Sequence, residues 1–358
     1  MHPRVKPPPI SGLIIELAMN PAVIHENATV ADDRLRAEFG DLISGCGVYD
    51  LNSRGRIAVT GSDRVRWLNG MVTNNIRDLA PGQGVYAFLL NPQGRILGDM
   101  HAYNVGESLA VDADTAQLPK ILETFDRYII MDDVEVADIS DRASAIGIAG
   151  PKTRSILNTA GLVLPPLQPL HLSASQWQEK EISIVRGDNP KIETYELWLS
   201  SENAKALLAA LTGAGATQVS GNALEWLRIV SGIPRYGTDI REKDLPQETR
   251  QERALNFSKG CYIGQEIVER IRSRGTVHRQ FTGFAIEGLL PEPGAELHVE
   301  GKKVGEITSV ASLPLGTGVR NIGLGYMRRE VAVGSKPLDG ERFQATPVSL
   351  PFDKFFKN

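Results

Sequence analysis

The sequence contains little cysteine, since Cys46 and Cys261 are the two cysteines in 358 residues. This number is too small for a disulfide framework or for a zinc site built on several cysteines. The six histidines are scattered, and no two of them stand at the spacing of paired metal ligands. We therefore expect the protein to hold no stable metal of its own.

Long hydrophobic runs are also missing, because no apolar stretch approaches the ~18–20 residues that span a bilayer. Near the N-terminus, Arg4 and Lys6 precede a short apolar run, but prolines and then Glu16 interrupt it. That pattern fits a secretory signal poorly. We predict a flexible arm over residues 1–30, a cytoplasmic location and no membrane partner.

The chain lacks the basic excess of a dedicated nucleic-acid binder, since 39 Lys and Arg face 43 Asp and Glu for a net charge of −4. Hydrophobic residues make up 42% and charged residues 23%, which is close to the average of globular proteins and excludes a disordered chain. The length exceeds one typical domain and predicts two or three.

The hydrophobic pattern predicts an α+β fold. A short helix over 32–39 should end at Gly40, and Asn91–Gly94 should turn a hairpin between strands 85–90 and 95–100. Short strands and helices then alternate to about residue 230, which favours α+β over a doubly wound sheet. After about residue 280 the pattern changes to short β runs separated by Gly and Pro. We predict two intertwined α+β subdomains over 31–275 and a small antiparallel β-barrel over 276–358.

The stretch 257–271 carries the most chemical information. Cys261 stands between two glycines, two residues after Lys259 and just before a predicted helix start at Gly264. A nearby cation and a helix N-terminus both favour a thiolate, which can act as a nucleophile, a redox sensor or a metal ligand. The alternative is a small residue packed in a tight turn, which is the common use of a free cysteine.

Two further residues are candidates from their types alone. Asp99 follows the predicted hairpin turn and could be a general acid or base, or bind an N–H group of a ligand; a solvated turn acid is the alternative. Trp226 could stack on a flat heterocycle, whereas core packing is the commoner role of tryptophan.

The only dense basic cluster could meet RNA phosphates. Glu266 and Glu269 precede it at helical spacing, so ion pairs along one helix explain it equally well. The cluster consists of Arg270, Arg272, Arg274, His278 and Arg279.

The stretch around Cys261 resembles the signature of the YgfZ family of folate-binding proteins. The residues that carry the resemblance are Lys259, Gly260, Cys261, Tyr262, Ile263, Gly264, Gln265 and Glu266, preceded by 232–237 and 245–248. The N-terminal half resembles the related T protein of the glycine cleavage system, an aminomethyltransferase, through 48–51, 61–63, Asn74 and 84–91.

The resemblance implies three α+β parts arranged in a ring, the last being a small β-barrel, with tetrahydrofolate or a one-carbon derivative in the central channel. It also implies a role in making or maintaining iron–sulfur clusters, including those of enzymes that modify tRNA. By the same resemblance, Cys261 would act at the channel rim and Trp226 would contact the folate. Asp99 and Tyr86 would contact it as well.

Two departures from the T protein argue against glycine cleavage. Its paired aspartates after the hairpin turn are reduced to Asp99, with Gly98 in the place of the other. The glutamate with which the T protein grips the pterin has no counterpart in the same register, although Glu193, one residue displaced, could substitute. A second folate tryptophan of bacterial YgfZ proteins would fall near Arg54.

Three hypotheses follow. The first is a tetrahydrofolate-binding accessory factor for iron–sulfur client or assembly proteins, in which Cys261 transiently holds sulfur, iron or a mixed disulfide. The second is a folate-dependent aminomethyl or methyl transferase with Asp99 as acid or base. The third is a non-enzymatic module that binds RNA or a protein through the basic cluster.

Overall fold

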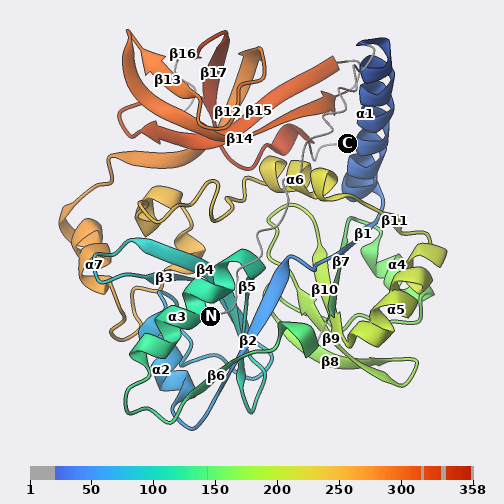
Figure 1. The fold of residues 1–358 in the computed structure, drawn as a ribbon, viewed down its shortest axis with the longest axis vertical. Coiled ribbons are helices and arrows are strands. Elements are labelled where there is room, and N and C mark those ends of the chain that lie inside the picture. Colours follow the sequence, from blue (N-terminus) through green and yellow to red (C-terminus); the bar gives the residue numbers. More distant parts are fainter. Residues whose placement is uncertain (1–20, 143, 316–317, 332–335, 356–358) are drawn as a thin grey trace, which may run out of the picture.

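The computed structural model describes residues 21–142, 144–315, 318–331 and 336–355, which form three parts (Figure 1). Two parts are β-sheets with helices beside them, and the third is a closed barrel drawn above both in Figure 1. This arrangement confirms the predicted α+β fold with a C-terminal antiparallel barrel. Residues 1–20 of the predicted arm lie outside the described part of the chain.

The first sheet is antiparallel, with the strand order β3-β4-β5-β2-β6. Alternate residues of β4 point to opposite faces of the sheet. Met100 is buried in the core on one face, whereas Asp99 and His101 are half-buried on the other. The elements are β2 (Arg54–Thr60), α2 (Arg64–Met71), β3 (Gly84–Leu90), β4 (Ile96–Asn104), β5 (Leu109–Asp114), α3 (Leu118–Tyr128) and β6 (Glu135–Asp138).

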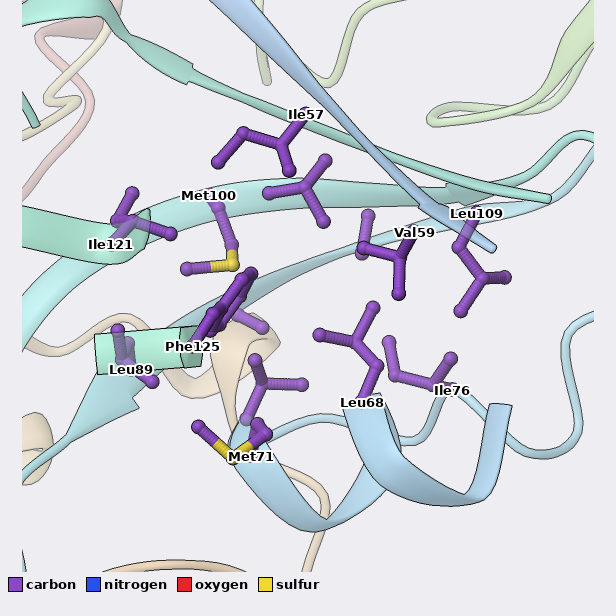
Figure 2. Packing of buried hydrophobic residues seen from close by; sticks show 14 of the residues in the cluster. Ile57, Val59, Leu68, Met71, Ile76, Leu89, Met100, Leu109, Ile121 and Phe125 are labelled. Atoms are coloured by element: carbon purple, nitrogen blue, oxygen red, sulfur yellow. The ribbon is translucent and has the colours of Figure 1, made fainter. Parts of the chain in front are cut away.

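The core of this part lies between the sheet and helices α2 and α3 (Figure 2). Figure 2 shows Leu68 and Met71 of α2 below the sheet and Phe125 of α3 beside Met100. Trp67 meets Phe125 edge to face, with ring centroids 5.1 Å apart. These apolar contacts hold one face of the sheet rigid, so its other face is free to line a site.

The second sheet has the order β11-β1-β7-β10-β9-β8. The chain enters it with β1, forms the whole first sheet and then returns with β7, which pairs with β1. Helices α4 and α5 pack beside it. Its elements are β1 (Gly47–Asp50), β7 (Ser144–Ala149), α4 (Thr153–Thr159), β8 (Leu172–Trp177), β9 (Lys180–Arg186), β10 (Thr194–Leu199), α5 (Ser201–Gly213) and β11 (Thr217–Gln218).

The barrel closes in the order β12-β15-β14-β13-β16-β17, and the pairs along it are antiparallel. Phe284, Leu297 and Ile307 are among the side chains that fill its interior. Its strands are β12 (Arg279–Gly288), β13 (Glu296–Val299), β14 (Lys302–Leu315), β15 (Gly318–Arg328), β16 (Leu338–Asp339) and β17 (Phe343–Val348).

Helix α1 (Pro21–Ser44) is much longer than the helix predicted over 32–39. It contradicts two predictions, because residues 21–30 are helical rather than part of a flexible arm, and Gly40 does not end the helix. A glycine inside a helix costs about 1 kcal/mol. Burial of Phe39 and Leu42, on either side of Gly40, offsets that cost.

Helix α6 (Gly221–Val230) lies between the barrel and the second sheet, as Figure 1 shows. The Arg228 guanidinium on this helix donates to Ser309 Oγ of β14 at 2.8 Å and to Asp239 Oδ2 at 2.6 Å. Buried Phe39, Leu227 and Phe281 belong to one apolar cluster shared by α1, α6 and the barrel. Within the described residues, no helix is both long and apolar enough to span a membrane.

Candidate functional site

Two adjacent cavities lie where the three parts meet. The sheet-side cavity, of about 220 Å³, is bounded by β1, β4, β10 and α6, and the barrel-side cavity, of about 440 Å³, is bounded by the start of β12 and the segments 231–233 and 349–351. Both are lined by Asp188 and Ile233, so these two residues form the boundary between them. Together the two cavities form a candidate site for a small molecule at an interface of subdomains.

Aromatic side chains form the walls of the sheet-side cavity. Tyr49 of β1 lines it, and its ring lies across Gly147 of β7, where an added Cβ would stand 2.0 Å from the ring. Tyr103 of β4 also lines the cavity and meets Trp198 edge to face, with ring centroids 5.4 Å apart. Gly147 is therefore required for the position of one wall.

A chain of charged side chains crosses the site. Arg253, which lines the barrel-side cavity, forms an ion pair with Asp188. Asp188 Oδ2 lies 3.9 Å from His101 Nε2, and His101 Nδ1 lies 3.3 Å from Arg54 Nη2. Arg54 then donates through Nε to Asp112 Oδ1 at 2.7 Å. The chain thus links the barrel-side cavity to the face of the first sheet.

His101 is the uncharged member of this chain. Burial, together with the nearby Arg54 cation, lowers its pKa to about 4, so the imidazole is neutral at pH 7. Its Nε2 is buried and makes no hydrogen bond within the described residues. A neutral imidazole nitrogen without a partner on a cavity wall can donate to or accept from a bound heterocycle, depending on the tautomer.

Asp99 and Tyr86, both predicted to contact a cofactor, lie together on neighbouring strands, and neither lines the two cavities. The Tyr86 hydroxyl donates to Asp99 Oδ2 at 2.7 Å, and Gln117 Nε2 donates to Oδ1 at 2.8 Å. Burial and the Asp99 carboxylate raise the pKa of Tyr86, so the phenol keeps its proton. Arg253 covers the Tyr86 ring at 4.4 Å, which connects the pair to the charged chain.

Glu193 does not line either cavity. Its carboxylate accepts from Arg154 Nη2 at 2.8 Å and from the Tyr195 hydroxyl at 3.1 Å, and the Arg154 hydrogen bond holds its pKa below the usual range. Glu196, three residues later on β10, lines the sheet-side cavity and accepts from Trp198 Nε1 at 2.8 Å. Burial raises the pKa of Glu196. The acid that faces the cavity is therefore a residue that the sequence analysis did not select.

Trp226 lies on the far face of α6 from the cavity. Leu224, Leu227 and Arg228 line the sheet-side cavity, whereas Trp226 is about 200° around the helix from Leu224. Its ring meets Phe39 of α1 edge to face, with centroids 5.6 Å apart. The structure thus places the predicted pterin-stacking residue in a contact with α1.

The signature loop packs against the first sheet, away from both cavities. Buried Lys259 donates through Nζ to the backbone carbonyls of Asn69, Val72 and Asn74, which ties the loop to the end of α2. Tyr262 is buried beside Tyr86 in one apolar cluster. Lys259 therefore has a structural role, and its ammonium is engaged away from the thiol that follows.

Gly264 and Gln265 shape the start of α7 (Gln265–Arg274). Gly264 has φ +82°, and an added Cβ would lie 2.5 Å from the carbonyl oxygen of Asn91 in the β3–β4 turn. Gln265 Oε1 accepts from Tyr262 N at 3.3 Å, and Glu266 is exposed in the first turn. These residues fix the loop, while at Gly260 no described residue other than its two chain neighbours has an atom within 4 Å of the place where a Cβ would stand.

The two cysteines have different surroundings. Cys261 is exposed in the signature loop and lines neither of the two cavities, so the structure does not place it at their rim. Cys46 is buried, its Sγ lies 3.7 Å from Thr153 Oγ1, and burial raises the pKa of its thiol. Among the residues with described coordinates, no group of three His, Cys, Asp or Glu could hold a metal ion.

The basic cluster is divided between two environments. Arg279 of β12 forms ion pairs inside the protein with Asp244, Glu248 and Glu306. Arg272 lies 3.4 Å from Glu269 and covers the ring of Phe257 at 4.4 Å. The internal pairing of Arg279 removes one cation from the surface that RNA could contact, and RNA binding by the others stays a prediction.

Comparisons with known proteins agree with the fold. Residues 17–259 match the GCVT N-terminal domain, and residues 279–351 match the CAF17 C-terminal beta-barrel domain. The chain is 28% identical over 357 residues, 97% of its length and 81% of the relative's, to an Arabidopsis thaliana protein that carries the name of a chloroplastic transferase.

Aminomethyltransferases are also similar to this chain. It is 29% identical over 329 residues to the aminomethyltransferase of Rubrobacter xylanophilus. The aligned region covers 90% of this chain and 87% of the relative. The crystal structure of the glycine cleavage system aminomethyltransferase T of Bartonella henselae superposes with a TM-score of 0.79 at 22% identity over 89% of both chains. The chain therefore belongs to the family of the GCVT N-terminal domain, to which it adds a barrel that matches CAF17.

Proposed function

We propose that this protein binds a tetrahydrofolate in the two central cavities and acts as an accessory factor of the CAF17/YgfZ type for assembly or repair of iron–sulfur clusters in client enzymes. The single observation that carries the proposal is a polar and aromatic cavity combined with an exposed cysteine that the fold holds in a fixed loop. The barrel that matches CAF17 supports it.

The residues at the cavities fit the chemistry of a folate. A pterin ring carries N–H donors and ring-nitrogen acceptors, and the walls offer the unpartnered His101 Nε2 and the flat rings of Tyr49 and Tyr103. The glutamate end of a folate carries carboxylates, and Arg250 and Arg253 line the barrel-side cavity. A folate oriented in this way would place its ring between the sheets and its acidic end toward the barrel.

The exposed thiol of Cys261 supports contact with a client rather than with the folate. Cys261 is exposed and lines neither cavity, and an exposed thiol can meet a sulfur or iron atom of another protein. Gly264 and Lys259 hold the loop to the first sheet, so the position of the thiol is set by the fold. Clients would be iron–sulfur enzymes, including those that modify tRNA, and we keep the cytoplasmic location as a prediction.

Complementation tests this function. In a strain that lacks this protein, wild type and Ser258→Ala should restore the activity of iron–sulfur enzymes, because Ser258 is an exposed neighbour in the same loop. Cys261→Ser should restore less than a tenth of that activity at equal protein level. Full restoration by Cys261→Ser would contradict the role of the thiol.

A specific arrangement favours a second candidate, a folate-dependent aminomethyl or methyl transferase. Asp99 is held by two donors, Tyr86 and Gln117, and lies one alternation along β4, about 7 Å, from His101 on the cavity wall. A carboxylate fixed in this way can accept a proton from an amine. The aminomethyltransferase names of several relatives agree with this candidate.

Turnover separates the two candidates. A transferase should form 5,10-methylene-tetrahydrofolate from an aminomethyl donor, and Asp99→Asn should lower kcat about 100-fold or more, the usual contribution of a general acid or base. Tyr86→Phe removes one of the two donors to Asp99 and should lower the rate less. Absence of turnover by a wild type that binds the folate would rule out this candidate and leave the accessory role.

A further inference from the structure

A large groove opens between the two sheets on the other side of the Tyr103–Trp198 contact from the sheet-side cavity. Tyr103 lines the cavity, whereas Trp198 lines this groove, whose volume is about 1140 Å³. Figure 1 shows the second sheet beside β2 and β5, the strands that form the other wall. The two spaces are thus separated by one pair of aromatic rings.

Arg56 of β2 lines this groove, and two of its guanidinium nitrogens have no hydrogen-bond partner among the described residues. The residue is 4% exposed, and its guanidinium carbon lies 4.0 Å from the centroid of the Trp198 ring. Its Nε and Nη2 are buried and make no hydrogen bond within the described residues. Buried polar groups are almost always hydrogen-bonded. Two nitrogens of this buried guanidinium make no hydrogen bond to a described residue, which points to a missing acceptor at the wall of the groove.

Asp112 forms an ion pair with Arg56 through Oδ2, while its Oδ1 is used by Arg54. Its Oδ1 accepts from Arg54 Nε at 2.7 Å, and Arg54 Nη2 also reaches the Asp112 carbonyl at 3.2 Å. Its Oδ2 lies 3.5 Å from Arg56 Nε, which is too long for a good hydrogen bond, and makes no hydrogen bond within the described residues. One carboxylate thus faces two guanidinium groups.

The other acid nearby does not complete the balance. Glu196 is hydrogen-bonded to Trp198 Nε1 at 2.8 Å, and burial raises the pKa of its carboxyl group, which favours the neutral form. Among the residues that line the groove, Arg56 and Arg142 are cationic and Glu181 is anionic. The lining therefore carries an excess of positive charge.

We propose that this groove is a second ligand site, which binds a small molecule through a carboxylate or phosphate group placed against Arg56. A planar guanidinium binds such groups with two parallel hydrogen bonds, and Arg56 Nη2 makes no hydrogen bond to any of the described residues. Arg142, in the segment that pairs with the Arg56 backbone, adds a second cation. The polar groups of Ser183 and Asn203 can bind the rest of the ligand. The site is independent of the proposed folate site.

Calorimetric titration of the full chain at low ionic strength tests the site, with inorganic phosphate in one arm and succinate in the other. The arm that shows binding tells whether phosphate or carboxylate is the ligand group. We expect one site with a Kd of about 1 mM or below and a loss of at least tenfold in Arg56→Gln. Arg127→Gln is the matched control, because Arg127 pairs with Glu123 on an exposed face of α3. This variant should bind phosphate or succinate as tightly as wild type does.

Two further measurements keep the result decisive if Arg56→Gln folds poorly. Ser175→Trp places a large ring in the groove from β8 without touching the Arg56 pairing and should abolish binding. Ligand should also change the fluorescence of Trp198, and Trp198→Phe should lose that change. Absence of binding in both arms at 20 mM, or unchanged binding in Arg56→Gln or Ser175→Trp, would overturn the proposal. Loss in Arg253→Gln alone would also overturn it, because the anion would then occupy the barrel-side cavity.

Discussion

Replacing Gly264 with alanine should destabilise the protein far more than the same change at Gly260, although both glycines flank Cys261 in the signature. Gly264 has φ +82°, a conformation that costs an L-residue about 1–2 kcal/mol. The new Cβ would stand 2.5 Å from the Asn91 carbonyl oxygen, a distance that real Cβ atoms essentially never show, so the β3–β4 turn must move. At Gly260, apart from its two chain neighbours, none of the residues that the structure describes has an atom within 4 Å of the added Cβ.

Adding about 1–2 kcal/mol for the displaced turn gives a loss of about 3 kcal/mol for Gly264→Ala and less than about 0.5 kcal/mol for Gly260→Ala. Urea unfolding followed by circular dichroism measures both free energies of unfolding. The rate at which a thiol reagent modifies Cys261 gives a second reading, since only Gly264→Ala should displace the loop. A difference between the two variants below about 0.5 kcal/mol would refute the claim that Gly264 fixes the loop.

Three further changes have defined outcomes. Lys259→Met leaves three buried carbonyls without their donor and should cost about 3 kcal/mol in urea unfolding, at about 1 kcal/mol for each bond; a loss under 1 kcal/mol would show that water replaces the ammonium. His101 has a pKa of about 4 in the folded protein and about 6.5 in the unfolded chain. Between these pH values the unfolded state binds more protons, so the free energy of unfolding falls as the pH drops from 6.5 to 4. His101→Gln should therefore lose less stability than wild type between pH 7.5 and 4.5, and equal losses would contradict the pKa. Phe125→Ala, at the fully buried centre of the first core, should cost about 3–5 kcal/mol in the same urea assay, and a cost below 1.5 kcal/mol would mean that the core of Figure 2 collapses around the gap.

The sequence predicted much of the fold because most elements carry local signals. The hairpin of β3 and β4 follows from the turn at Asn91–Gly94, and the β-rich end follows from short runs separated by Gly and Pro. The full length of α1 could not be predicted, because Gly40 is a local stop signal and the apolar contacts that override it come from α6 and the barrel. Tertiary packing thus decided this boundary.

The candidate site was predicted in part. Asp99 and Tyr86 were selected but line neither cavity, whereas the alternation Asp99, His101, Tyr103 along β4 was a signal that could have added the two residues that do. Helical spacing also separates Trp226 from Leu224 and Leu227, so the packing role of Trp226 could have been inferred from the sequence. By contrast, the ion pair of Asp188 with Arg253 joins residues in two irregular segments far apart in the chain, and no local pattern pairs them.

The most direct test of the central claim is calorimetric titration of tetrahydrofolate into wild type, Leu224→Trp and Trp226→Leu. The two variants alter opposite faces of α6, since Leu224 lines the sheet-side cavity and Trp226 packs on Phe39. We predict micromolar binding by wild type and loss of binding in Leu224→Trp, because the larger tryptophan side chain fills the cavity. In Trp226→Leu the Kd should stay within about threefold of the wild-type value. No binding by wild type, or loss in Trp226→Leu with binding retained in Leu224→Trp, would contradict a folate site in these cavities.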